Sequence, residues 1–237
     1  MTVTEQPWIF ATKPVSECGP CSTEIFSVRH PHITDLHRLR GQRRANILLG
    51  SSTLHNIWRS QQFRGVRDFR HDIIIGGRVH DSHYSYLHHT RGWHGPSNVI
   101  IACGNNNVNT SDSYRDIAFQ LLSLVRTIKR QNPDNRVVIA SLLYAPKYCD
   151  RSLPASRNML KKVRSVNRWI EDFNSRETGI QFDLGKYGVI GDPSKGDYVV
   201  HEYKEWKEPN LERKLHLTDQ VKNEIAYHLV NIFLKLS

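Results

Sequence analysis

Long apolar runs are absent from this sequence of 237 residues. No window reaches the ~18–20 uninterrupted apolar residues that a membrane-spanning helix requires. The first 17 residues contain two acids and two prolines, whereas a secretion signal has a basic start and a long apolar stretch. We therefore expect an intracellular, cytoplasmic protein with no membrane among its partners.

Cysteine is scarce, and its four residues are too scattered for the disulfide framework of a small secreted domain. Cys18 and Cys21 have the spacing of a zinc or redox pair, but no second ligand pair follows at zinc-finger spacing. The histidines between His80 and His89 lack the HExxH pattern of a metal site, so we expect a polar helix face there. The sequence therefore predicts no metal and no cofactor.

Glycine and proline are also few, at 14 and 10 residues, while 38% of the residues are hydrophobic. This composition excludes a collagen-like, low-complexity or disordered chain. Residues 1–45 show no clear apolar period, contain several prolines and end in a basic stretch. We expect a partly ordered N-terminal arm over 1–45, followed by one folded domain over 46–237.

Within that domain, short apolar runs alternate with longer amphipathic segments, which is typical of a parallel sheet covered by helices. The nearly continuous apolar character of the runs fits strands that are buried on both faces. Five strands are expected, over 46–50, 72–76, 98–103, 136–144 and, more weakly, 180–183. The expected fold is a three-layer α/β/α sandwich with a flavodoxin-like, five-stranded parallel sheet in the order 2-1-3-4-5.

Apolar residues at helical spacing predict three helices that face the core. The stripes run from Ile117 to Ile128, from Met159 to Phe173 and from Val221 to Leu236. No repeat with a period of 20–50 residues is visible, which excludes solenoids and propellers.

Polar and glycine residues follow the expected strands, where ligands bind in an open parallel sheet. Ser52 follows the first strand and Gly77 the second, while Asn106 follows the third and His216 precedes the last helix. A hydroxyl, a glycine backbone, a carboxamide and an imidazole are therefore expected at one edge of the sheet.

This order of Ser, Gly, Asn and His resembles the SGNH, or GDSL, hydrolase family over residues 46–237. The resemblance implies a serine ester hydrolase with Ser52 as the nucleophile and His216 as the general base. It also implies that the Gly77 N–H and the Asn106 side chain hold the oxyanion, with a small ester as substrate and no cofactor.

Three positions depart from the family pattern. Ser51 and Asn107 stand where the family blocks have aspartates, and Arg213 stands at the aspartate of the triad. A guanidinium there disfavours the imidazolium that forms during catalysis, unless Glu212, Asp219 or a backbone carbonyl orients the histidine. Glu212 is the candidate residue for this role. Weak hydrolysis by a Ser52–His216 dyad and a loss of catalysis both remain open.

The net charge of +10 favours a second function, since 33 basic residues face 23 acidic ones. A stripe of basic residues at helical spacing, together with a basic segment before the first strand, predicts binding to RNA or another polyanion. The candidate residues are Arg157, Lys161, Arg164, Arg168, Arg43 and Arg44. The RNA-binding domain of the germ-plasm protein Oskar and some retrotransposon reading frames look like this fold, which is a second resemblance.

Overall fold

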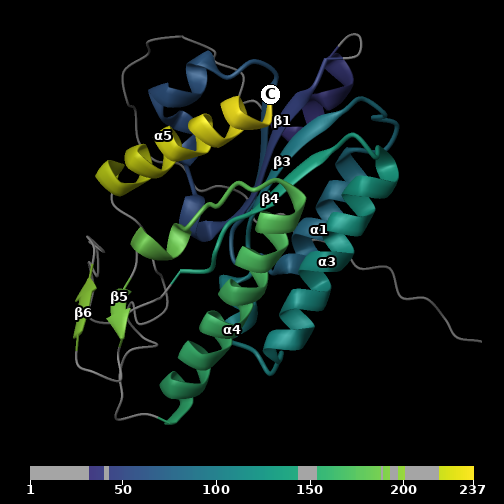
Figure 1. The fold of residues 1–237 in the computed structure, drawn as a ribbon. Coiled ribbons are helices and arrows are strands. Elements are labelled where there is room, and N and C mark those ends of the chain that lie inside the picture. The colour runs from purple at the N-terminus through teal and green to yellow at the C-terminus, as the bar shows by residue number, and fades with distance from the viewer. Residues whose placement is uncertain (1–31, 40–42, 144–153, 188, 193–196, 201–218) are drawn as a thin grey trace, which may run out of the picture. The chain divides into compact units, whose positions relative to one another are not determined.

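The computed structural model describes residues 32–39, 43–143, 154–187, 189–192, 197–200 and 219–237 (Figure 1). Its main sheet contains β1 (Ala45–Ser51), β2 (Phe69–Ile74), β3 (Ser97–Ala102) and β4 (Arg136–Ile139). All neighbouring strands in it are parallel, in the order β2-β1-β3-β4. The α/β class and the first four places of the expected strand order are confirmed.

The prediction of a fifth strand at 180–183 is wrong, because this segment has no strand conformation. Ala140 donates its N–H to β3, so the N–H and carbonyl of Ile139 point to the opposite, outer side of β4. There the buried side chain of Asn174 binds both groups of Ile139, at 2.9 and 2.7 Å. A helix amide thus takes the place of a strand, and Phe182 reaches this edge through one backbone bond from Ser141.

Five α-helices accompany the sheet within the described residues. They are α1 (Val79–His89), α2 (Asn105–Val108), α3 (Tyr114–Gln131), α4 (Pro154–Glu177) and α5 (Asp219–Leu236). The three predicted apolar stripes lie on α3, α4 and α5 and face the core, as expected. The histidine run lies on α1, as the polar pattern predicted.

Short elements complete the described chain. The 3₁₀ helices are η1 (Ile33–Arg38), η2 (Ser52–Leu54), η3 (Ile57–Arg59), η4 (Gln61–Gly65) and η6 (Leu184–Tyr187). A separate antiparallel pair consists of β5 (Val189–Asp192) and β6 (Asp197–Val200).

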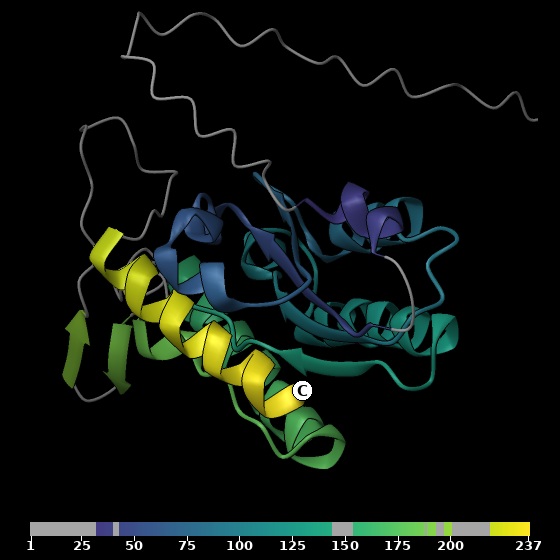
Figure 2. The same ribbon diagram turned by 90° about the horizontal axis from the view of Figure 1, so that it is seen from above.

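Alternate residues of the central strands face two separate cores. Ile47 and Leu49 contact the core formed with α1, α3 and α4, whereas Leu48 contacts the core formed with α5, η2, η3, η4 and η6. Figure 2 shows α5 (yellow) on the opposite side of the sheet from α3 (teal). Because the strand period is two, a helix layer on each face explains the unbroken apolar runs. The three-layer sandwich is therefore built on a sheet that is buried on both sides.

The residues just before β1 also contribute to this packing. Ile33 and Leu36 of η1 are fully buried in the core on the side of α1. The boundary at residue 45 stays a prediction, as does the arm, whose first 31 residues lie outside the described part, with Cys18 and Cys21. Among the helices that are described, none has the length and apolar character needed to cross a membrane.

Candidate active site

Ser52 lies at the carboxyl end of β1, a central strand with a partner on each side. Ser51 pairs with Ile74 of β2, and Gly50 pairs with Ala102 of β3. The segments that follow β2 and β3 therefore leave the sheet on either side of Ser52. The predicted convergence of these segments at one sheet edge follows from this register.

Two adjacent serines are found at this edge, and their surroundings differ. The Ser51 side chain is buried, and its hydroxyl lies 3.0 Å from that of Thr53. Ser52 is half-buried, and its carbonyl accepts the His55 N–H in the turn of η2. Of the two serines, Ser52 is the less buried.

Gly77 forms a tight turn after β2. Its N–H donates to the Ile74 carbonyl over 3.0 Å, and the preceding Gly76 has a φ of 74°. A Cβ atom on Gly77 would lie 2.7 Å from the Ile74 Cβ, which is closer than real side chains approach. Any larger residue at position 77 would therefore clash with Ile74. The Gly77 N–H already has an acceptor in the turn, the Ile74 carbonyl.

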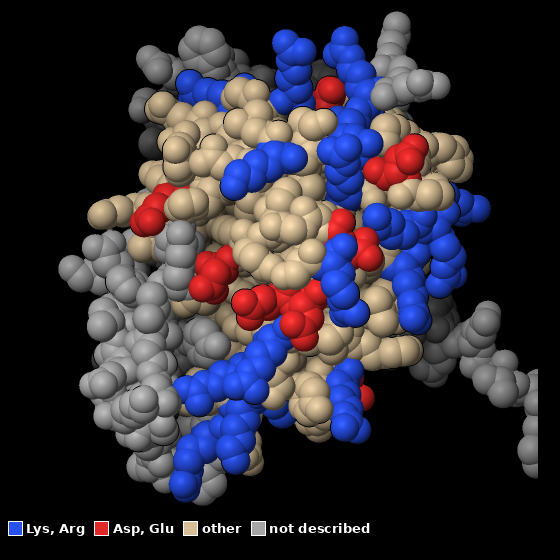
Figure 3. Space-filling model, in the orientation of Figure 1, with Lys and Arg blue, Asp and Glu red and all other residues tan. Residues whose placement is uncertain are grey.

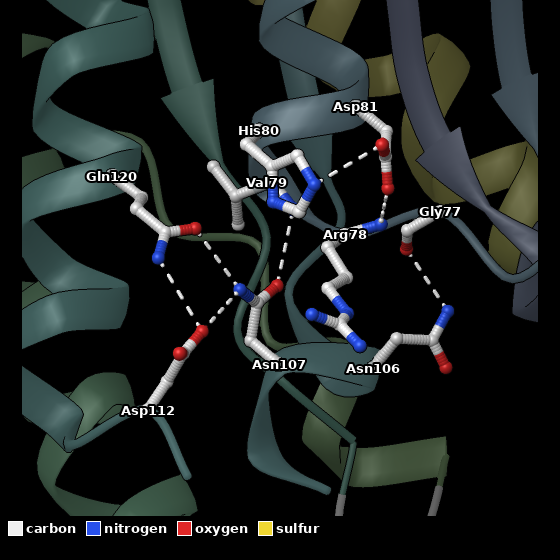
Figure 4. A network of polar contacts seen from close by, with 9 residues as sticks. All are labelled: Gly77, Arg78, Val79, His80, Asp81, Asn106, Asn107, Asp112 and Gln120. Carbon is white, nitrogen blue, oxygen red and sulfur yellow. Dashed lines mark hydrogen bonds and ion pairs between the residues drawn. The ribbon is translucent and has the colours of Figure 1, made fainter. Parts of the chain in front are cut away.

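Asn106 joins this turn to the segment after β3. Its Nδ2 donates to the Gly77 carbonyl over 2.9 Å (Figure 4). Gly104, which precedes α2, has a φ of 120°, a conformation that side chains other than glycine rarely adopt. The hydrogen bond from Asn106 thus brings together the two residues predicted for the oxyanion hole.

Asn107 is completely buried and connects three elements. Its Oδ1 accepts the Val79 N–H at the start of α1 over 3.0 Å, while its Nδ2 donates to Asp112 and Gln120. These hydrogen bonds hold the pKa of the Asp112 carboxyl below its usual range, with the largest effect from Asn107. The sequence identified Asn107 only as a departure from a family block, since its partners are set by the fold.

Solved structures with this architecture are known, although no protein-family model matches the sequence and no curated protein matches it. A GDSL-like lipase from Bacteroides thetaiotaomicron superposes with a TM-score of 0.62 at 14% identity, over 86% of this chain and 98% of that one. The chain has the SGNH/GDSL hydrolase-like fold.

Two further structures agree with this SGNH-like fold. A lipase/acylhydrolase from Enterococcus faecalis gives a TM-score of 0.57 at 10% identity, over 81% of this chain and 96% of that one. A member of the lipolytic G-D-S-L family from Veillonella parvula gives a TM-score of 0.54 at 12% identity, over 81% of this chain and 99% of that one. At such identities the likeness concerns the fold.

The SGNH-like site contains one group that sequence reasoning missed, the exposed side chain of Arg78. This residue follows Gly77 directly, and its N–H donates to the Asp81 carboxylate over 2.8 Å. The signal available in the sequence was a cation next to the glycine that is predicted for the oxyanion hole. His216, Glu212 and Arg213 lie outside the described residues, and their roles stay predictions.

The predicted basic residues lie at two different ends of the sheet. Asn174 of α4 binds Ile139 and Asn167 binds Leu142, so the earlier part of α4 extends beyond the carboxyl ends of the strands. This part carries the basic stripe, and Figure 3 shows Lys and Arg side chains gathered over the end where α4 begins. Its members are Arg157, Lys161 and Arg168, which are exposed, and Arg164, which is half-buried.

Arg44 lies at the opposite end, before β1. Its guanidinium donates to the Asp134 carbonyl over 2.8 Å, and burial, followed by the nearby Arg136, lowers its pKa. Arg44 thus ties the starts of the strands together, whereas its neighbour Arg43 is exposed. The structure does not bring the two predicted basic segments into one patch.

Proposed function

We propose that the protein hydrolyses esters by acyl transfer through Ser52. The observation that supports this function is the hydrogen bond between Asn106 and Gly77, the two residues proposed to bind the oxyanion, which we call the oxyanion corner. Ser52 starts the segment that leaves β1 and is half-buried, whereas the neighbouring Ser51 is buried. A nucleophile beside preorganised amide donors is the arrangement that acyl transfer requires.

In the proposed mechanism His216 removes the Ser52 proton as Oγ attacks the ester carbonyl. The tetrahedral oxyanion is held by the second N–H of Asn106, which makes no hydrogen bond to a described residue. The Gly77 N–H contributes as a donor shared with Ile74. His216 then protonates the leaving alcohol, and water, activated by the same imidazole, releases the acid and regenerates Ser52.

Asn106 carries most of the oxyanion stabilisation in this proposal, because the turn already uses the Gly77 N–H. One such donor is typically worth ~3–4 kcal/mol in the transition state, or about two to three orders of magnitude in rate. Glu212 is proposed to orient His216 in place of the triad aspartate. The Arg213 guanidinium lowers the basicity of His216, which makes turnover slow.

A fluorophosphonate probe tests the nucleophile without knowledge of the substrate. Wild-type protein should be labelled and should hydrolyse a short-chain para-nitrophenyl ester, and Ser52→Ala should lose both properties. Ser51→Ala is the matched control, because it removes the neighbouring hydroxyl and leaves Ser52 in place. Labelling that persists in Ser52→Ala, or that is lost only in Ser51→Ala, contradicts the assignment.

A second candidate function is binding of RNA, favoured by the basic stripe on the projecting part of α4. Reversing Arg157 and Lys161 to Glu removes two candidate phosphate contacts. The plot of log K against log salt should then become less steep, by about 1.4 for a single-stranded partner or about 1.8 for a duplex. Arg126→Glu/Arg130→Glu on α3 is the control, with the same spacing and charge change. Equal weakening of RNA binding in both variants would show that only the net charge of the protein matters, and would contradict a binding surface on α4.

A further inference from the structure

Arg78 extends from the turn that forms the oxyanion corner. Gly77, whose carbonyl binds Asn106, is its immediate neighbour, so the Arg78 backbone lies one residue from this contact. Figure 4 shows the Arg78 side chain directed toward Asn106 and Asn107. The guanidinium is thus presented on the side of the turn where the oxyanion donors lie.

The Arg78 guanidinium is available to a ligand. Across the part of the chain that the structure describes, it has no hydrogen bond and no ion pair, and the side chain is exposed. Asp112 is electrostatically coupled to it, yet Asp112 Oδ2 already accepts Asn107 at 2.9 Å and Gln120 at 3.3 Å. The Asp81 carboxylate is likewise engaged, by the Arg78 N–H and by His80.

Further positive charge surrounds this edge of the sheet. Lys162 of α4 donates from Nζ to the Thr110 carbonyl, just after α2, over 2.8 Å. The start of α4, with Arg157 and Lys161, projects beyond the same ends of the strands. An incoming anion therefore meets a cationic rim, with Arg78 next to the amide donors.

We infer that Arg78 selects esters that carry a carboxylate or phosphate group near the scissile bond, an inference that rests on the proposed ester hydrolysis. The guanidinium binds that group while Asn106 binds the carbonyl oxygen, so the anion fixes the orientation of the substrate. Since the side chain is exposed, one charge contact contributes about fivefold in kcat/KM, the upper range for surface ion pairs.

Matched pairs of esters test this selectivity on either side of the scissile bond. The mono-para-nitrophenyl ester of glutaric acid is compared with the pentanoate ester, and acetoxybenzoic acid with its methyl ester. Wild-type protein should prefer the charged member of at least one pair about fivefold, and the preference should shrink at high salt. Phenyl phosphate and benzoate as competitive inhibitors then distinguish phosphate from carboxylate.

Arg78→Gln should lower kcat/KM for the charged esters about fivefold and that for the neutral esters less, which removes the preference, while Arg78→Lys should keep part of it. Arg91→Gln, beyond the other end of α1, removes the same charge away from the site and should behave as wild type. If charged and neutral esters are hydrolysed at equal rates while fluorophosphonate labelling is intact, the selectivity inferred for Arg78 is wrong and the proposed ester hydrolysis still holds. Absence of both labelling and ester turnover overturns the proposed function with it.

Discussion

Two adjacent asparagines after β3, Asn106 and Asn107, have different hydrogen-bonding roles. Asn106 is half-buried and binds the Gly77 carbonyl, whereas Asn107 is fully buried and holds α1, Asp112 and Gln120 together. A carboxylate at residue 107 could accept the Val79 N–H but could not donate to Asp112. The departure of Asn107 from the family block therefore has a structural reason, namely the carboxylate of Asp112 beside it.

The isosteric change Asn107→Asp tests this pairing. It replaces a donor by a buried negative charge beside Asp112, and we expect the free energy of unfolding at neutral pH to fall by about 2–4 kcal/mol. Urea denaturation measures the change, which should diminish in acid as one carboxyl takes up a proton. The double variant Asn107→Asp/Asp112→Asn restores a donor and an acceptor, and should recover stability. A double variant no better than the single one would refute the pairing.

At the scale of elements, α4 fixes the outer edge of the sheet through side-chain amides. Asn174 binds the N–H and carbonyl of Ile139, and Asn167, two helical turns earlier, binds those of Leu142. These bonds satisfy backbone groups that a fifth strand would otherwise have paired. The helix that carries the basic stripe is thereby held against the end of β4.

Asn174→Ala should destabilise the fold strongly, because it leaves the buried N–H and carbonyl of Ile139 without partners. An unsatisfied buried group costs about 1–3 kcal/mol, so a loss of about 2–4 kcal/mol is expected for the two. The urea midpoint should fall while the denaturant slope stays constant. Asn158→Ala, exposed on the same helix, serves as the control. A midpoint shift equal in both variants would contradict the role given to Asn174.

At the scale of the whole molecule, apolar patterning predicted most of the architecture. The runs at β1 and β3 and the stripes of α3, α4 and α5 were correct because burial on one or both faces dictates them. The second strand begins at Phe69, three residues earlier than expected. The apolar pattern missed this start because the polar His71 occupies a buried position. Ile75, which was assigned to this strand, is 69% exposed.

The sequence predicted which of the described candidate residues follow the strands, but not the geometry between them. The order of Ser52, Gly77 and Asn106 along the chain identified the sheet edge. The hydrogen bond from Asn106 to Gly77, and the use of the Gly77 N–H inside its own turn, depend on the φ angles at Gly76 and Gly104. The spacing of apolar residues along the sequence does not predict turn geometry of this kind.

Two histidines of α1, His83 and His89, are expected to make the stability of the whole fold dependent on pH. Burial, and then the Arg130 guanidinium, lowers the pKa of His83, whose Nε2 lies 2.8 Å from the Thr127 hydroxyl. Burial also lowers the pKa of His89, and this effect exceeds the opposing one of the Asp72 carboxylate. Both imidazoles are thus harder to protonate in the folded chain than in the unfolded chain.

Stability should therefore be complete well above pH ~6.5, the ordinary histidine pKa, and fall as the pH drops through that value toward the lower folded pKa values. Urea midpoints for wild type between pH 7 and 5 measure this fall, above the range in which Asp112 titrates. His83→Gln/His89→Gln, which cannot take up these protons, should show a flatter profile, and the exposed His94→Gln should follow wild type. Parallel profiles for all three proteins would mean that other groups cause the fall. A rise in stability on acidification would contradict the direction of both pKa shifts.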